Sequence, residues 1–188
     1  LDNSATTKPC DAAIEACIDA MKQNYGNPSS LHKKGFEAEQ IIMKARQAIA
    51  KVLFCEPNEI FFTSGATESN NLAIMGSVFA NRRKGNKIIT TAIEHPSVKE
   101  ACKALEQQGF LVEEIMPRED GTYHEMDFYN KTDEKSILVT CMWVNNETGL
   151  VLPVEKIAKA VKRKNPNTVV HVDGVHGFLK LPIKIKNS

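Results

Sequence analysis

The chain has 188 residues, and the hydrophobic share of 42% is typical of a globular protein with a sizeable core. Its 24 Lys and Arg residues nearly balance 23 Asp and Glu residues, and the formal net charge of +1 gives no sign of a nucleic-acid or anionic-membrane partner. No apolar run reaches the length of a membrane-spanning helix.

Two helices are predicted in the first third of the chain. Residues 9–23 place apolar side chains at helical spacing, and a longer helix follows the turn at residues 26–29 and stops before Pro57. The expected inward positions are Ile14, Cys17, Ile18 and Met21 in the first helix and Ile41, Ala45, Ala48, Ile49 and Val52 in the second.

Strands and helices alternate in the rest of the chain. The predicted strands are 59–63, 87–92, 110–115, 136–144 and 168–172, and the predicted helices are 67–82, 96–107 and 153–164. Their expected inner faces carry Val98, Cys102 and Leu105 in the second of these helices and Ile157, Ala160 and Val161 in the third. Such alternation is typical of βαβ units, so we predict a three-layer α/β fold with a mainly parallel sheet covered by helices.

Five dispersed cysteines without a CxxC pair favour free thiols in a reducing compartment. We therefore expect a cytoplasmic protein. Cys17 and Cys102 are predicted to be small core residues, because both fall on apolar helix faces.

Polar side chains follow most of the predicted strands. They are Gly65-Ala66-Thr67-Glu68, Glu94-His95-Pro96, Asn145-Asn146-Glu147-Thr148-Gly149 and Asp173-Gly174-Val175-His176. The carboxyl ends of parallel strands share one edge of a sheet, and ligands bind there. Each residue also has a purely structural interpretation: His95 could cap a helix, Asn146 could form a turn, Asp173 could bind loop amides, and His176 could be a surface residue.

This set of residues fits pyridoxal phosphate better than a nucleotide, because neither GxGxxG nor GxxxxGK[ST] occurs. The helix start at Ala66 and Thr67 would bind the phosphate. An imidazole such as His95 could stack on the cofactor ring, Asp173 could hold the protonated ring nitrogen, and Asn146 could donate to the phenolic oxygen. No metal site is predicted.

Six segments resemble the cysteine desulfurases, which are pyridoxal-phosphate enzymes of the class V aminotransferase group. In order along the chain, the segments are "LDNSATTKP", "NPSSLH", "FTSGATESNNLAI", "EHPSV", "VNNETG" and "HVDG". The resemblance implies that residues 1–188 comprise an N-terminal helical segment and most of the cofactor-binding large domain.

The resemblance also implies roles for single residues. Ala66 and Thr67 would bind the phosphate, His95 would lie over the ring and transfer protons, Asn146 would contact cofactor and substrate, and Asp173 would pair with the ring nitrogen. The family usually has Gln at the position of His176, where a neutral imidazole can also donate a hydrogen bond.

The implied reaction removes sulfur from L-cysteine, leaves alanine and forms an enzyme persulfide for delivery to an iron–sulfur scaffold or another acceptor, in a homodimer. In the family, the Schiff-base lysine and the persulfide cysteine come later than Ser188, and Lys180, Lys184 and Lys186 come too early. We therefore expect an N-terminal half that is inactive alone. A selenocysteine lyase, an aminotransferase and a non-catalytic α/β module remain as alternatives.

Overall fold

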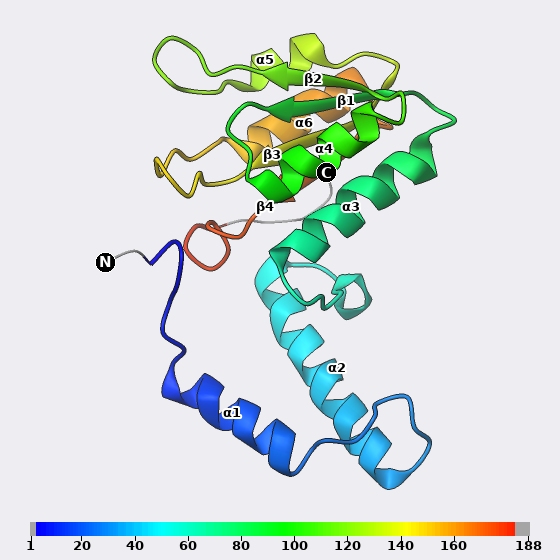
Figure 1. The fold of residues 1–188 in the computed structure, drawn as a ribbon, viewed down its shortest axis with the longest axis vertical. Helices are drawn as coiled ribbons and strands as arrows, with labels where there is room; N and C mark the ends of the chain where they lie inside the picture. Colours follow the sequence, from blue (N-terminus) through cyan, green and yellow to red (C-terminus); the bar gives the residue numbers. More distant parts are fainter. Residues whose placement is uncertain (1–2, 183–188) are drawn as a thin grey trace. The chain divides into compact units, whose positions relative to one another are not determined.

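The computed structural model describes residues 3–182, which form two compact units. The first comprises residues 3–62, and the second comprises residues 63–182. Figure 1 traces both units along the chain. Lys184 and Lys186 lie outside the described residues.

The first unit is helical. It contains α1 (Asp11–Lys22), α2 (Lys33–Leu53) and the 3₁₀ helix η1 (Pro57–Glu59). His32 caps α2 by accepting a hydrogen bond from the Gly35 amide at Nδ1, and the helix ends at Phe54 in a left-handed conformation with φ of 56°.

The predicted inner faces of these two helices are wrong. No residue of α1 is buried, so Cys17 is exposed rather than a core residue. In α2 the buried residues are Gly35, Ala38 and Ala50, whereas Ile41 and Val52 are exposed. Ala45 and Ala48 are exposed too, and Ile49 is half-buried. Both helices do carry apolar side chains at helical spacing, but within residues 3–62 no other element covers these apolar faces.

The strand predicted over residues 59–63 is also wrong. The segment begins as η1, where Glu59 Oε2 accepts a hydrogen bond of 2.7 Å from the Glu56 amide, and continues as an irregular stretch to Gly65. Phe61 and Phe62 are exposed. Aromatic residues favour a strand only where a neighbouring strand is available, and none pairs with this segment among residues 3–182.

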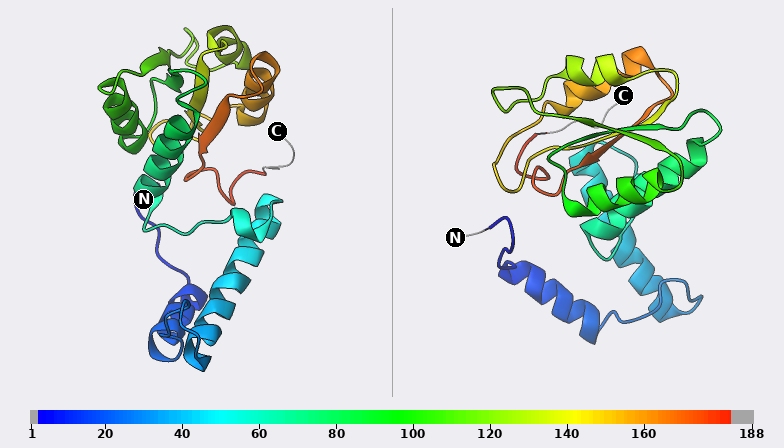
Figure 2. Two further views of the ribbon diagram at one scale, coloured as in Figure 1. Left: turned by 90° about the vertical axis from the view of Figure 1, so that its right-hand side faces the viewer. Right: turned by 45° about the horizontal axis from the view of Figure 1, so that its top comes forward.

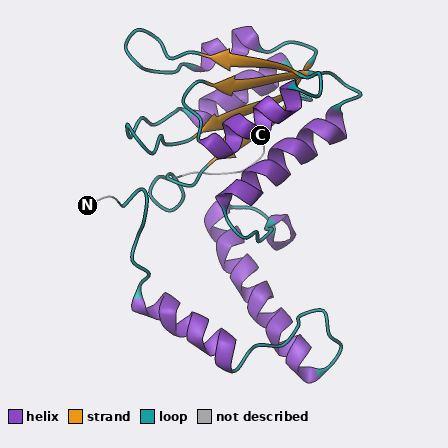
Figure 3. Cartoon of the chain, viewed as in Figure 1, coloured by secondary structure: helices purple, strands orange, loops and turns teal. Residues whose placement is uncertain are grey.

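The second unit is built on a four-stranded sheet. Its strands are β1 (Lys87–Thr91), β2 (Leu111–Ile115), β3 (Ser136–Met142) and β4 (Val169–Asp173), in the order β2-β1-β3-β4. Every pair is parallel, which confirms the prediction of a mainly parallel sheet. Figure 3 shows these strands against the helices around them.

Helices cover both faces of the sheet, which confirms the predicted three layers (Figure 2). On one face, α3 (Ala66–Asn81) packs against α4 (Pro96–Glu106). On the other, α5 (Glu125–Lys131) packs against α6 (Val154–Lys164). The sequence analysis did not predict α5, whose polar start is fixed by a capping box between His124 and Asp127.

The core lies between the sheet and its helices. The cluster under α3 and α4 contains Ile74, Val78, Ile88, Val98, Ala101, Cys102, Leu105, Ile137 and Leu138. Val98, Cys102 and Leu105 in α4 and Ile157, Ala160 and Val161 in α6 are buried as predicted.

Candidate functional site

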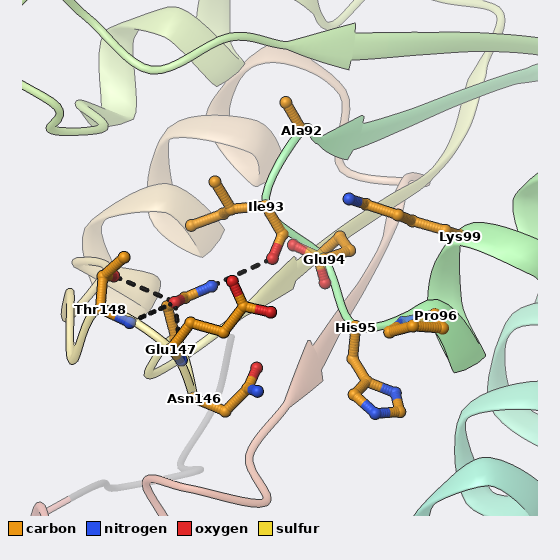
Figure 4. Close-up of a pocket in the computed structure, with 10 residues that line it drawn as sticks. Ala92, Ile93, Glu94, His95, Pro96, Lys99, Asn146, Glu147 and Thr148 are labelled. Atoms are coloured by element: carbon orange, nitrogen blue, oxygen red, sulfur yellow. Dashed lines mark hydrogen bonds between the residues drawn. The ribbon is translucent and has the colours of Figure 1, made fainter.

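The candidate site lies where the chain reverses its direction across the sheet. From β1 the chain moves outward to β2 and then returns to place β3 on the other side of β1. Such a switch point opens a crevice at the carboxyl ends of the two strands, and it is the usual ligand site of open parallel sheets. A pocket of about 290 Å³ lies there (Figure 4). It is lined by Ala92, Ile93, Glu94, His95, Pro96, Lys99, Asn145, Asn146, Glu147 and Thr148.

Asn145 builds one wall of this pocket. Its buried side chain donates to the Ile93 carbonyl at 3.1 Å, and its Oδ1 accepts from the amides of Glu147 and Thr148 at 3.0 and 2.8 Å. These bonds tie the loop after β3 to the end of β1. The neighbouring Asn146 is half-buried, and its side chain extends to the same side of the pocket as His95 (Figure 4). Asn145 is therefore structural, and Asn146 is the asparagine available to a ligand.

His95 forms the second wall at the N-cap of α4. Its Nδ1 accepts from the Ser97 amide at 3.1 Å and lies 2.8 Å from Ser97 Oγ, while Pro96 occupies the first helical position. The helix-capping interpretation is thus correct for Nδ1. It does not compete with a ligand, because the ring still lines the pocket.

Asp173 is the last residue of β4, and its side chain is 7% exposed. One carboxylate oxygen accepts from the Val175 amide at 3.1 Å, and the other accepts from Asn70 Nδ2 at 2.8 Å. The same Asn70 nitrogen lies 2.9 Å from Ser97 Oγ. A continuous hydrogen-bonded row therefore joins Asp173, Asn70, Ser97 and His95.

Glu94 is a second buried carboxyl group beside the pocket. One oxygen accepts from the Thr91 hydroxyl and, at 2.9 Å, from the Met142 amide, whereas Oε2 is buried without a hydrogen-bond partner among the described residues. Burial raises the pKa of Glu94 to about 7, these two hydrogen bonds oppose the shift, and the charge of Asp173 adds to it. Glu94 is therefore only partly ionised near neutral pH.

The start of α3 carries the predicted phosphate contacts, Ala66 and Thr67. Gly65 is the N-cap residue, and no side chain caps the helix among the described residues. Glu68 bonds instead to the amide and hydroxyl of Ser64, at 2.7 and 2.6 Å. The first amides of α3 are the natural donors for an anion.

The structure unites the predicted residues only in part. His95 and Asn146 line the pocket, and Asp173 joins His95 through the hydrogen-bonded row. Ala66 and Thr67 lie one helical turn before Asn70 but do not line the described pocket. His176 is half-buried in the turn after β4.

Asn70 and Ser97 were not predicted as site residues, and Glu94 was named among the strand-end residues without a role of its own. Asn70 shares the buried face of α3 with Ile74 and Val78, at four-residue spacing. The sequence could have pointed to Asn70, because its amide stands at a position of α3 that is otherwise apolar, and a buried polar group needs a partner.

The comparisons with known proteins agree with this fold. Residues 1–188 match the family described as Aminotransferase class-V, and the chain belongs to that family. A relative named cysteine desulfurase IscS, from Methanosarcina thermophila, is 40% identical over 99% of this chain and 46% of its own length.

Solved structures show the same likeness. A NifS-like protein has a TM-score of 0.94 at 40% identity and covers 99% of this chain and 51% of its own. SspA in complex with cysteine has a TM-score of 0.92 at 34% identity, and the match covers 98% of this chain and 52% of SspA. A C-DES mutant with glycine covalently linked to its PLP cofactor has a TM-score of 0.72 at 25% identity, and the match covers 92% of this chain and 45% of that one. The chain therefore spans about half the length of the relatives it matches.

No helix within residues 3–182 is long and apolar enough to cross a membrane. The same residues hold no group of three or more His, Cys, Asp or Glu side chains placed to bind a metal ion.

Proposed function

We propose that this chain supplies the cofactor-binding half of a pyridoxal-phosphate-dependent cysteine desulfurase. The observation that carries the proposal is the buried carboxylate of Asp173, held at the end of β4 and joined by hydrogen bonds to His95. Family membership and the names of the relatives support it.

The residues present fit the cofactor. The first amides of α3, at Ala66 and Thr67, have no capping side chain among the described residues and suit a phosphate group. Asp173 still has acceptor capacity on both oxygens, so it can pair with a protonated ring nitrogen. A flat ring between these two points would be contacted by His95 and Asn146, and His176 could donate to the phenolic oxygen.

Bound pyridoxal phosphate supplies an electron sink that withdraws charge from the substrate carbon. Asp173 would keep the ring nitrogen protonated, which the electron sink requires. His95 would pack on the ring and could carry a proton at Nε2, while Ser97 occupies Nδ1. Asn146 orients the polar edge of the ligand. In the overall reaction, L-cysteine and an enzyme thiol become L-alanine and an enzyme persulfide, which conserves every atom.

A titration with pyridoxal phosphate tests the cofactor site. Trp143 is the only tryptophan, follows β3 directly and donates its amide to the Asp173 carbonyl at 2.9 Å. Its fluorescence should be quenched as the cofactor binds. Pyridoxal without the phosphate should bind at least about tenfold more weakly, because it lacks the anion that the α3 amides attract. Equal affinity for both compounds would contradict the phosphate site.

One variant and a matched control test the role of the carboxylate. Asp173→Asn should retain much of the cofactor but lose most desulfuration in an active enzyme, because a neutral partner no longer favours the protonated ring nitrogen. Glu119→Gln, an exposed carboxylate change, is the control. Desulfuration by Asp173→Asn at the wild-type rate would overturn the role of Asp173.

The 188-residue chain alone should release no sulfide from L-cysteine above the level of free cofactor. In the family, the amine that binds the cofactor covalently and the acceptor thiol belong to the second half of the chain. Borohydride reduction with peptide mapping checks this. One uniquely labelled lysine together with sulfide release would contradict it. Release of selenide from selenocysteine, without release of sulfide from L-cysteine, would indicate a selenocysteine lyase.

We also propose a cytoplasmic homodimer that hands sulfur to an iron–sulfur scaffold or another acceptor. The name IscS of the relative supports the acceptor, and five free cysteines support a reducing compartment. The exposed apolar side chains Ile14, Ile18 and Met21 on α1 support an oligomer. Sedimentation that shows only monomer at micromolar concentration would contradict the dimer.

A further inference from the structure

The row of hydrogen bonds between Asp173 and His95 has a direction that can be worked out from donors and acceptors. A carboxylate accepts hydrogen bonds and donates none, so Asn70 must present Nδ2 rather than Oδ1 to Asp173. The orientation of this amide is therefore fixed by chemistry. The same Nδ2 lies 2.9 Å from Ser97 Oγ, and its second hydrogen is donated there.

The hydroxyl of Ser97 can then donate in one direction. Its oxygen accepts from Asn70, so its own hydrogen is donated to His95 Nδ1, which lies 2.8 Å away. The Ser97 amide donates to the same Nδ1 at 3.1 Å. With two donors directed at it, Nδ1 carries no hydrogen.

We propose that Asn70 and Ser97 are positioning residues that transmit the charge of Asp173 to His95 and fix the neutral imidazole as the tautomer with its hydrogen on Nε2. Each step is short, and Asn70, Ser97 and Asp173 are 4%, 8% and 7% exposed, so water competes little with the row. His95 can therefore donate a hydrogen bond or a proton at Nε2. Nδ1 can take up a proton only if the hydroxyl and amide hydrogens of Ser97 turn away from it.

The inference deepens the proposed function, because it states how the proposed ring-stacking histidine is oriented. It does not depend on cofactor binding, since all four residues lie in the second unit and make these contacts in the chain itself.

The test measures the tautomer of His95 by nitrogen chemical shifts in protein labelled with ¹⁵N-histidine. The His95 signals are assigned from their absence in His95→Gln. Wild type should show the form with hydrogen on Nε2 in excess. Asn70→Ala, which removes no contact of His95 itself, should lower the ratio of the two tautomers at least about fivefold, the factor that one lost hydrogen bond corresponds to. Freed from Asn70, the hydroxyl of Ser97 can accept from Nδ1.

Matched variants separate this effect from general disturbance. Asn71→Ala removes a neighbouring amide of α3 that donates to the Thr67 carbonyl at 2.9 Å, and it should leave the ratio unchanged. Ser97→Ala should lower the ratio by a smaller factor, because it removes one donor to Nδ1 but leaves no hydroxyl oxygen that could accept a hydrogen from Nδ1. Ser77→Ala on α3 is its control.

Asn70→Ala strands a buried carboxylate and could prevent folding. Ser97→Ala leaves Asn70 on Asp173 and provides the second route to an answer. The double variant should change the ratio by less than the product of the two single effects, because both act through one row. The proposal is overturned if wild type carries its hydrogen on Nδ1, or if Asn70→Ala and Asn71→Ala give the same ratio. If the ratio behaves as expected but pyridoxal phosphate does not bind, the proposed function fails and the positioning role stands.

Discussion

Glu94 links the pocket to the pH dependence of stability. Its pKa is about 7 in the folded chain, against an ordinary value of 4.5. Between these values the unfolded chain releases the proton while the folded chain retains it. Stability contributed by the protonated group is therefore fully present below pH 4.5 and is lost as the pH rises to about 7.

Glu94→Gln should remove this pH dependence. The glutamine keeps the shape of the side chain and cannot ionise, so the free energy of unfolding should lose a slope worth roughly 2–3 kcal/mol between pH 4.5 and 7. Urea titrations followed by Trp143 fluorescence at several pH values measure it. Glu119→Gln, on an exposed segment, should keep the wild-type slope. An unchanged slope in Glu94→Gln would show that Glu94 ionises normally in the folded chain.

Gly177 matters because the ring of Trp143 lies directly against its backbone. A Cβ at this position would lie 2.3 Å from Trp143 Cε3, and the ring is buried. Gly177→Ala should therefore lower the free energy of unfolding by about 1–3 kcal/mol. Gly174→Ala is the matched control in the same turn, because no heavy atom lies within 4 Å of its added Cβ. Urea unfolding of both variants compares them, and equal stability would contradict the packing argument.

At the residue scale, the sequence predicted His95, Asn146 and Asp173 because each follows a strand, and parallel strands end at one edge of the sheet. It did not predict Asn70. The contact of Asn70 with Asp173 spans 103 positions of the chain and depends on how α3 packs on the end of β4. No local pattern contains that information.

At the element scale, β1 begins with an unusual charge. Lys87 is only 8% exposed, and its Nζ lies 2.8 Å from Glu113 on β2 and 3.0 Å from Asp133 before β3. Burial alone would lower the pKa of Lys87, but the bonds to Glu113 and Asp133 outweigh burial and raise it. The lysine thus joins three segments at the edge of the sheet opposite the pocket.

Lys87→Met should destabilise the sheet by about 2 kcal/mol, because it leaves two carboxylates without their shared cation. Both carboxylates are partly exposed, so the cost is below that of a fully buried pair. Lys84→Met, three positions before the first residue of β1, is the exposed control. Chemical denaturation measures both, and a Lys87→Met chain as stable as wild type would show that the network contributes nothing.

The sequence correctly predicted the buried faces of helices that pack against strands of their own βαβ unit. The buried faces of α4 and α6 follow from spacing, because the sheet covers them. Spacing also gave apolar faces for α1 and α2, but it cannot show whether anything covers a face. The strand expected at 59–63 was wrong for the same reason, because strand-forming residues need a partner strand.

At the scale of the whole molecule, the five thiols should divide into three classes. Cys10 and Cys17 are exposed, Cys55 is half-buried, and Cys102 and Cys141 are buried. Burial raises the pKa of Cys55, and the negative charges of Glu59 and Glu56 raise it further. Burial also raises the pKa of Cys102, to about 12, and that of Cys141. The thiolate is the reactive form, so these shifts slow reaction further.

Labelling with a chromogenic disulfide reagent, at a concentration low enough to keep the chain monomeric, should show two fast thiols, one slower thiol, and two that react only in denaturant. Mass mapping should identify the fast pair as Cys10 and Cys17. Cys17→Ser should remove one fast thiol and leave the rest unchanged. A Cys17 that reacts as slowly as Cys102 would mean that α1 is covered in solution, for instance in an oligomer.

The strand order also bears on synthesis at the ribosome. β1 and β2 emerge close together and can pair early. The other side of β1 can pair only after β3 has emerged, and Asn70 can bond to Asp173 only after the end of β4 has emerged. Pairing between distant segments is slow to form. Throughout that interval a nascent chain exposes the apolar edge of β1 and the unpaired amide of Asn70. We therefore expect chaperone dependence to peak before β4 emerges and to fall once the last strand completes both the sheet and the hydrogen-bonded row.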